Sequence, residues 1–228
     1  MNGSITQIQW SPDSSILAAS TTDGTLALLQ SQPGDELLRP VLVFKAHRAS
    51  KGQQDMKFGS LTKFAEIWSL AWSPDGKMVA TSSEDQTTRI WTTEGDLVKV
   101  LTGHTTAVTS VKWKKSLGSS SPEMLVTCAD DMRVMVWDPL KWELLRTVQT
   151  DQLEEWHTLT YVSIEPGPGS RIVAVTQNGY FVAWDGITGK HLSHHKIHAA
   201  SVEGLVWDPR TSFLATCSSD CSATVFQI

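Results

Sequence analysis

Cysteine is scarce in this 228-residue chain, which has three cysteines, an odd number. A small secreted protein held by disulfides needs an even set, so the count favours a reducing compartment. No apolar run approaches the roughly 18–20 residues that a membrane-spanning helix needs. The N-terminal stretch MNGSITQIQW also lacks the basic and apolar regions of a signal peptide. We therefore expect a cytosolic or nuclear location.

Several chemical signatures are missing as well. No segment shows sustained helical periodicity, and GPGS at 167–170 is not followed by a helix as a phosphate loop would be. There is no G-x-S-x-G nucleophile motif. The formal net charge of −5 argues against a general affinity for nucleic acid or anionic lipid. We expect no enzymatic activity, no small-molecule substrate, and no direct binding to nucleic acids or membranes.

Tryptophan, in contrast, is abundant, with ten residues that follow a pattern. An acid or amide recurs six positions before a bulky apolar residue, at intervals of 42 to 62 positions. The five pairs are Asp23/Leu29, Asp85/Trp91, Asp131/Trp137, Asn178/Trp184 and Asp220/Phe226. A unit of about 40–45 residues that recurs five times indicates a repeat architecture.

Each unit has the residue pattern that is typical of β-strands. Apolar and polar residues alternate in ITQIQW and TSVKW, and short apolar runs such as ILAAS and MLVTC follow. The segments between them are rich in Gly, Pro, Asp and Ser, as turns require. The unit is therefore predicted to be a four-stranded antiparallel meander. Such sheets bury their faces by packing radially, blade against blade.

The third unit has the most complete set of signature residues: Gly103, His104, Thr127, Asp131, Trp137 and Asp138. On these residues the chain resembles the WD-repeat (WD40) β-propeller family across nearly its whole length. In that family the corresponding His, Ser/Thr, Asp and Trp form a structural tetrad that pins each blade. The resemblance implies an all-β fold, a β-propeller of four-stranded antiparallel blades with about five WD repeats.

The other units match this tetrad to different degrees. The second unit has Thr81, Asp85 and Trp91, with His47 as a possible member displaced by an insertion; the fifth has His198, Thr216, Asp220 and Phe226 in place of tryptophan. The fourth has Ala174 and Asn178 at the Thr and Asp positions, and the first keeps only Asp23. We interpret the tetrads as structural, because removing one buried member leaves its partner unpaired, at about 1–3 kcal/mol.

We expect one WD-repeat domain over residues 1–228, with blades at roughly 1–47, 64–102, 103–150, 156–196 and 197–228. The pattern contains five first, second and third strands but only four fourth strands. Because the resemblance implies rings that most often have seven blades, three explanations remain. The chain is an incomplete propeller or part of a seven-bladed ring, which we favour, a five-bladed ring, or an open array that a partner completes.

Residues 48–63 form a basic insertion between His47 and the first strand of the second blade, with Arg48, Lys51, Lys57 and Lys63 against one acid. It is either a mobile polar loop without a partner or a docking element for an acidic partner. The family topology places it on the face that holds the turn aspartates. The residues next to those turn positions are further candidate partner contacts: Thr22, Glu84, Asp130, Gln177 and Ser219.

The stretch HLSHHKIH at 191–198 has four histidines. On a regular strand His191 and His195 share one face while His194 shares the other with His198, so we assign no metal and no cofactor. Cys128 and Cys217 lie in apolar second strands, where we expect buried, inert thiols.

The sequence thus predicts a non-enzymatic scaffold or adaptor that binds other proteins within a multi-protein complex. The alternative is a substrate-recognition subunit of a larger enzyme complex, such as a ubiquitin ligase or a chromatin-modifying complex. The motif WDPR at 207–210 gives that alternative no specific support, because it follows a first strand instead of a third. The sequence does not identify the partner, the pathway, the binding face or the way in which a ring would close.

Overall fold

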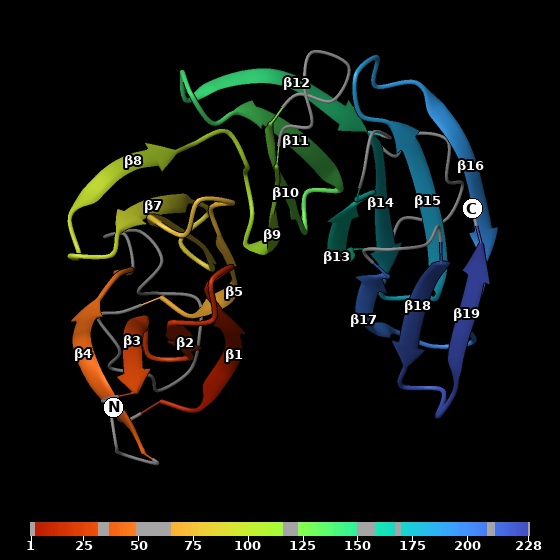
Figure 1. Ribbon diagram of the computed structural model, residues 1–228. Coiled ribbons are helices and arrows are strands. Elements are labelled where there is room, and N and C mark those ends of the chain that lie inside the picture. Colours follow the sequence, from red (N-terminus) through yellow and green to blue (C-terminus); the bar gives the residue numbers. More distant parts are fainter. Residues whose placement is uncertain are drawn as a thin grey trace, which may run out of the picture. The chain divides into compact units, whose positions relative to one another are not determined.

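The computed structural model describes residues 3–31, 37–48, 65–115, 123–149, 158–166, 170–208 and 213–227. These residues form 19 strands in five antiparallel sheets and no helix (Figure 1). Accordingly, no helix long and apolar enough to span a bilayer occurs among them. The chain divides into two compact units, Met1–Val108 and Thr109–Ile228.

The first unit contains two four-stranded sheets, blade 1 and blade 2, each a simple meander. Blade 1 consists of β1 (Ile5–Trp10), β2 (Ile16–Thr21), β3 (Thr25–Ser31) and β4 (Leu38–Lys45). Blade 2 consists of β5 (Ile67–Trp72), β6 (Met78–Ser83), β7 (Thr88–Thr92) and β8 (Leu97–Leu101).

The second unit contains three sheets, and its first strand begins at the boundary between the units. Blade 3 consists of β9 (Val108–Lys114), β10 (Met124–Ala129), β11 (Arg133–Asp138) and β12 (Glu143–Gln149), and blade 4 of β13 (Leu159–Ile164), β14 (Arg171–Thr176), β15 (Tyr180–Asp185) and β16 (His191–Lys196). Blade 5 has three strands: β17 (Val202–Trp207), β18 (Phe213–Ser218) and β19 (Ala223–Gln227). The predicted all-β fold of repeated antiparallel blades is confirmed.

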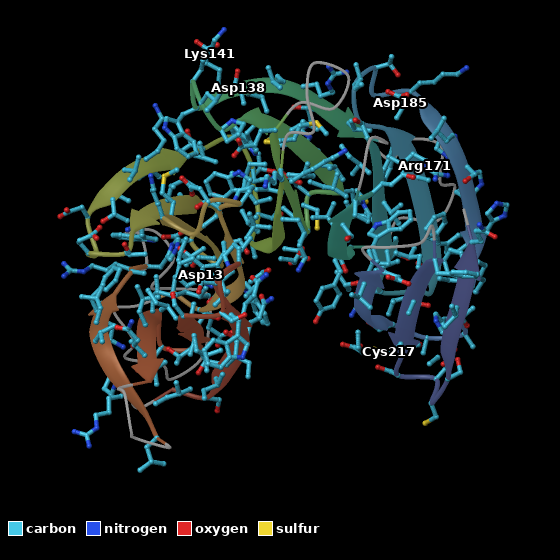
Figure 2. The ribbon with its side chains drawn as sticks, viewed as in Figure 1. Asp13, Asp138, Lys141, Arg171, Asp185 and Cys217 are labelled. Carbon is cyan, nitrogen blue, oxygen red and sulfur yellow. The ribbon has the colours of Figure 1, made fainter. Side chains whose placement is uncertain are left out.

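Aspartates form turns at the end of the sheets where the first strand leads into the second and the third into the fourth. Asp75 accepts a hydrogen bond from Ser73 Oγ (2.7 Å) in the turn between β5 and β6. Asp138 and Asp185, labelled in Figure 2, are the last residues of β11 and β15, and each follows a tryptophan. Each accepts two backbone N–H groups of the next turn at 2.7–3.1 Å. The aspartate of each Trp-Asp pair is therefore a turn former, because its carboxylate replaces backbone acceptors.

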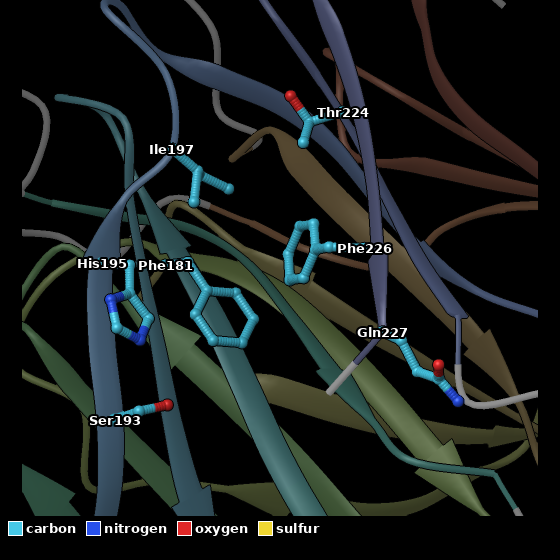
Figure 3. A pocket seen from close by; sticks show the side chains of 7 residues that line it. All are labelled: Phe181, Ser193, His195, Ile197, Thr224, Phe226 and Gln227. Carbon is cyan, nitrogen blue, oxygen red and sulfur yellow. The ribbon is translucent and has the colours of Figure 1, made fainter.

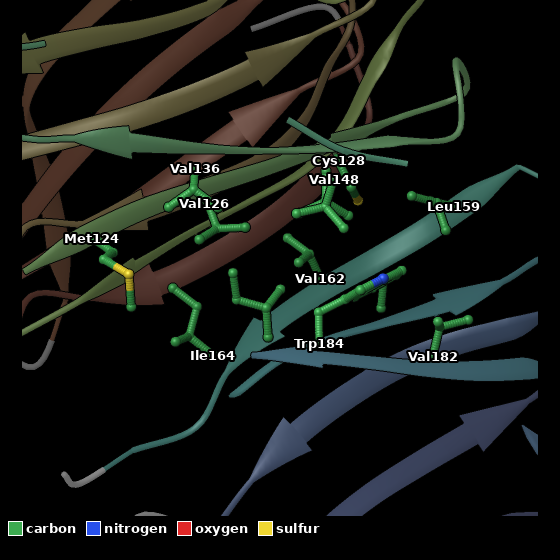
Figure 4. Packing of buried hydrophobic residues seen from close by; sticks show 13 residues of the cluster. Met124, Val126, Cys128, Val136, Val148, Leu159, Val162, Ile164, Val182 and Trp184 are labelled. Atoms are coloured by element: carbon green, nitrogen blue, oxygen red, sulfur yellow. The ribbon is translucent and has the colours of Figure 1, made fainter. Parts of the chain in front are cut away.

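The core lies between neighbouring blades rather than within one sheet. In the second unit, Val126, Val136 and Val148 of blade 3 pack against Val162 and Trp184 of blade 4 (Figure 4). In the first unit, an equivalent cluster joins Leu28 of blade 1 to Leu70 and Trp91 of blade 2. Each blade thus buries one face only when a neighbour is present, which explains why the unit recurs.

First strands are also tied to one another by hydrogen bonds. Thr109 Oγ1 donates to the carbonyl of Leu159 (2.7 Å), and Thr160 Oγ1 donates to that of Val202 (2.9 Å). These bonds align blades 3, 4 and 5 at the start of their first strands. The turns at that end of each sheet, which carry the predicted site residues, are consequently held on a rigid base.

Candidate functional site: the hairpin turns and their buried networks

The turn between β6 and β7 in blade 2 holds a buried polar network. His47, which follows β4, places Nδ1 2.9 Å from Asp85 Oδ2 and Nε2 2.8 Å from Thr81 Oγ1. Trp91 Nε1 donates to the same Thr81 oxygen (3.0 Å). The four side chains named from the sequence therefore meet in one chain of hydrogen bonds, with His47 fully buried.

The partners define the protonation state of His47. Thr81 Oγ1 accepts the indole N–H of Trp91, and its own hydrogen can be donated to His47 Nε2 (2.8 Å) or to the Arg89 carbonyl (3.4 Å). The Asp85 carboxylate can only accept, so His47 Nδ1–H donates to it. A neutral imidazole satisfies both ends. In agreement, burial lowers the pKa of His47 despite the opposing effect of the Asp85 carboxylate.

Asp85 is fully engaged by its neighbours. Its Oδ1 accepts the backbone N–H (3.0 Å) and the hydroxyl (2.6 Å) of Thr87, and its Oδ2 also accepts Arg89 (3.0 Å). Burial acts to raise the pKa of Asp85, but the hydrogen bond and charge of His47, with Thr87 and Arg89, hold the pKa below its ordinary value. Because both carboxylate oxygens have protein partners, Asp85 orders the turn.

A contact with blade 1 positions His47. The backbone N–H groups of Ala46 and His47 both donate to the carbonyl of Gly24 (2.9 and 3.3 Å), which lies in the β2–β3 turn at φ +75°. His47 is thereby set on the preceding blade before the insertion begins. An insertion after His47 therefore does not displace the histidine from its network, which spacing alone could not tell.

Blade 5 contains a similar arrangement. His198 Nε2 lies 2.8 Å from Thr216 Oγ1, and its Nδ1 lies 3.1 Å from Asp220 Oδ2. Asp220 also accepts Ser222 Oγ (2.6 Å) and the Ala199 N–H (2.8 Å), and these bonds, led by that of Ser222, lower its pKa. Phe226 occupies the tryptophan position and brings no N–H for Thr216.

Gly179 positions the histidine of blade 5 through its backbone carbonyl, as Gly24 positions the histidine of blade 2. Its carbonyl accepts the N–H groups of Ile197 and His198 (2.9 and 3.1 Å). Gly179 adopts φ +87°, and a Cβ at this position would overlap the carbonyl oxygen of His198. Glycine is required here for both reasons.

In blade 3, Trp137 Nε1 donates to Thr127 Oγ1 (3.0 Å), and Asp131 Oδ1 accepts the Arg133 N–H (3.1 Å). His104 is buried and belongs to the first unit, whereas the other three residues belong to the second.

Blades 1 and 4 hold their turns in another way. Asp23 accepts the hydroxyls of Thr21 and Thr25 (2.6 Å each) and forms an ion pair with Lys45 (2.8 Å). Asn178 Oδ1 accepts Thr176 Oγ1 (2.6 Å), while its Nδ2 is buried without a hydrogen-bond partner in the described part of the chain. A threonine two residues before the turn residue thus replaces the histidine.

The five candidate partner contacts occupy equivalent places at the end of their sheets. The backbone N–H groups of four of them donate to the residue that precedes the first strand, at 2.9–3.0 Å: Thr22 to Ser4, Glu84 to Glu66, Gln177 to Thr158 and Ser219 to Ser201. Thr22 and Glu84 are half-buried, whereas the side chains of Asp130, Gln177 and Ser219 are exposed. Partial burial and the charge of Asp131 raise the pKa of Asp130.

The basic insertion can be placed only at its start. Arg48 is exposed, whereas Lys51, Lys57 and Lys63 lie outside the described residues. In the portion that the structure describes, no three His, Cys, Asp or Glu side chains gather as a metal site would require.

The predicted faces of the histidine-rich strand are wrong. His194 Nδ1 lies 3.3 Å from His191 Nε2, so these two side chains lie together instead of on opposite faces. The pairing of β15 with β16 shifts between Ala183 and Trp184, which inserts Leu192 as an extra residue. Such a bulge reverses the alternation on one side of itself, and nothing in the local sequence marks it.

The expectation for one cysteine is also wrong. Cys128 is buried, and burial raises its pKa to about 12. Cys217, at the same position of β18, is exposed. Blade 4 covers the face of blade 3 that holds Cys128. The corresponding face of blade 5 is open, with Val225 and Val206 more than half exposed. Whether a cysteine at this strand position is buried thus depends on the neighbouring blade and not on the strand that contains it.

The family model described as the WD domain, G-beta repeat (WD40) matches residues 2–28, 54–92, 95–138 and 189–227, more than half of the chain. Most of blade 4, which departs furthest from the tetrad pattern, lies outside the match. Protein HIR1 of Cryptococcus neoformans is 27% identical over 184 residues, covering 70% of this chain and 20% of that protein. The nuclear distribution protein PAC1 of Arthroderma otae is 28% identical over 171 residues, covering 71% and 36%.

A solved structure titled "Structure of U3-55K" superposes with a TM-score of 0.75 and 19% identity, and covers 100% of this chain and 62% of that one. At this identity the likeness shows the fold alone. The chain spans about a fifth to a third of the length of the curated relatives given above. From the matched repeats and the blades that they form, the chain belongs to the WD40 repeat family.

Proposed function

We propose that this protein is a non-enzymatic scaffold that binds other proteins within a multi-protein complex in the cytosol or the nucleus. The observation that supports the proposal best is the contrast between the turns and the residues beside them. Networks of hydrogen bonds hold the turns of blades 2 and 5, while the neighbouring position is Thr, Glu, Asp, Gln or Ser in the five blades. Different side chains on equivalent rigid supports suit recognition.

Affinity purification with mass spectrometry tests this proposal. A triple variant should lose partners that the natural chain recovers. It replaces two acidic side chains and one neutral side chain by lysine: Glu84→Lys, Asp130→Lys and Gln177→Lys. A matched control, Lys141→Glu, changes an exposed charge in the turn at the opposite end of blade 3 (Figure 2) and should retain them. Equal recovery by all three proteins, or recovery of no protein by the natural chain, would contradict the scaffold function.

The same experiment addresses the alternative role as a substrate-recognition subunit. Stable recovery of ubiquitin-ligase or methyltransferase subunits with the natural chain, lost in the triple variant, would favour that more specific role. Recovery of structural partners alone would leave the general scaffold.

A further inference from the structure

The fourth strand of blade 4, β16, carries two histidine side chains that lie together. His194 Nδ1 is 3.3 Å from His191 Nε2, and the two ring centroids are 5.2 Å apart. His191 is half-buried and His194 is exposed, so solvent reaches both rings. The prediction that residues 191–198 bind no metal assumed that these two side chains are on opposite faces of the strand, and this assumption is wrong.

The register of the sheet explains why the two side chains share a face. His191 pairs with Trp184 of β15. The extra residue Leu192 then brings His194 opposite Val182. Trp184 and Val182 both belong to the cluster that packs against blade 3. Because directly opposed residues of paired strands place their side chains on the same face, both histidines are on the face of the sheet toward blade 3.

The same bulge occurs in blades 1, 2 and 3, but with other side chains. In each of these sheets the pairing of the third with the fourth strand shifts at the corresponding point. The two equivalent positions hold Pro40 and Val43 in blade 1, Leu97 and Val100 in blade 2, and Leu144 and Thr147 in blade 3. The bulge therefore does not require histidine at either position, and the folding of blade 4 does not explain the pair.

The distance between the two nitrogens fits a tetrahedral metal ion. Histidine nitrogens bind Zn²⁺ at about 2.0–2.1 Å, so two of them at the tetrahedral angle of about 109° lie about 3.3–3.4 Å apart. The separation in blade 4 is 3.3 Å. A square-planar ion, with about 90° between neighbouring ligands, would need a separation of about 2.8–3.0 Å. Mg²⁺ and Ca²⁺ prefer oxygen ligands and do not select imidazole.

The surroundings favour the neutral rings that a metal requires. Burial, with the charge of His194, lowers the pKa of His191 and so favours its neutral form at pH 7. Lys196, opposite Tyr180, lies on the same face of the strand. Its ammonium group is 5.7 Å from the centroid of the Tyr180 ring, where the aromatic face attracts it.

We propose that His191 and His194 form a binding site for Zn²⁺. His191 Nε2 and His194 Nδ1 are the two protein ligands, and each neutral ring keeps its proton on its other nitrogen. No third His, Cys, Asp or Glu side chain of the described residues joins the pair, so water completes the tetrahedron in the isolated chain. The site does not depend on the scaffold function, because neither histidine is at a turn position.

Isothermal titration calorimetry of the full chain with ZnCl₂ tests the site. Every protein in the experiment carries Cys217→Ser and Cys221→Ser, because these exposed thiols can bind zinc themselves. In this background zinc should bind, and MgCl₂ should not. The double variant His191→Leu/His194→Val has the side chains of blade 2 at the two positions, and it should raise the Kd for zinc by about tenfold or more.

The neighbouring histidine provides a matched control. His195 is exposed but pairs with Phe181, so it lies on the other face of the strand, where it lines a pocket of about 320 Å³ with Phe181 and Phe226 (Figure 3). His195→Ala should therefore leave the Kd for zinc unchanged. The proposal is overturned if the background protein binds no zinc, if the double variant keeps its Kd, or if the control loses as much affinity as the double variant.

NMR of the imidazole groups is a second measurement, and it needs no histidine substitution. Zinc should shift the ring signals of His191 and His194 and leave those of His195 in place. Shifts confined to other histidines would overturn the proposal. One zinc ion per two chains, with shifts of the same two rings, would support the site and identify a second copy of the chain as the source of the remaining ligands.

Discussion

Blade 2 and blade 4 build the same hairpin with different chemistry. In blade 2 a neutral histidine, a threonine, an aspartate and a tryptophan form a continuous buried chain of hydrogen bonds. In blade 4 the turn amide Asn178 accepts one hydroxyl, and the fully buried Trp184 packs among valines and isoleucines. The comparison shows that packing between blades suffices to form a blade. The polar network adds local stability and holds one turn in one geometry.

The largest difference in stability between blades 2 and 4 is expected when the polar residue of each second–third strand turn is replaced by alanine. Asp85→Ala leaves His47 Nδ1–H and Arg89 without their carboxylate inside a buried network, which should cost about 3–5 kcal/mol. Asn178→Ala removes one hydrogen bond and an unpaired amide nitrogen, and should cost about 1 kcal/mol or less. Hydrogen exchange at β6–β7 and β14–β15 measures the two local free energies of opening. Equal losses in the two blades would show that the network contributes nothing beyond packing.

The next effect isolates the hydroxyl that links the histidine to the tryptophan. Thr81→Val keeps the shape but leaves His47 Nε2 and Trp91 N–H unpaired, and should cost about 1–3 kcal/mol. Thr158→Val serves as a control, because its hydroxyl bonds to the exposed Gln177 and its loss should stay within about 0.5 kcal/mol. Denaturant unfolding of both variants is the measurement, and a control that falls as far as Thr81→Val would contradict the assignment.

Lowering the pH should destabilise blade 2 more than blade 4. Burial lowers the pKa of His47, so the unfolded chain binds a proton first. The stability that His47 contributes is complete above its ordinary value of 6.5 and is lost as the pH falls from there toward the lower folded-state pKa. Asp85, whose folded-state pKa is also lowered, adds a further loss as the pH falls through that pKa.

The turn of blade 4 contains no titratable group at the position of Asp85, so exchange at β14–β15 should change less between pH 7 and 5 than exchange at β6–β7. His47→Gln should reduce the dependence in blade 2. A pH dependence that persists in this variant would assign the effect to another group.

The smallest effect is expected in blade 5. Phe226→Trp restores an indole N–H that can donate to Thr216 Oγ1, as Trp91 donates to Thr81, and should stabilise β18–β19 by about 0.5–1.5 kcal/mol. Exchange at these two strands measures the gain. A loss of stability would show that the larger ring does not fit beside Phe181.

The repeat could be predicted because its signals are local. Turn residues such as Asp85 and Gly179 recur in phase, and strands of about six residues alternate between them. The insertion after His47 made its role uncertain in the sequence, since the histidine is positioned by a backbone contact with Gly24 that no spacing records. The faces of His191 and His194 could not be predicted, because a one-residue bulge at Leu192 reverses the alternation.

By itself the sequence determined the fold class, the five-fold recurrence of the unit and the polar residues of its turns, because hydrogen bonds within a hairpin join residues that are close in sequence. Only the tertiary structure decided which thiol is buried and that His191 and His194 lie together. The physical reason is that burial and packing depend on the side chains of the adjacent blade, about 40 residues away, and these differ from one junction to the next.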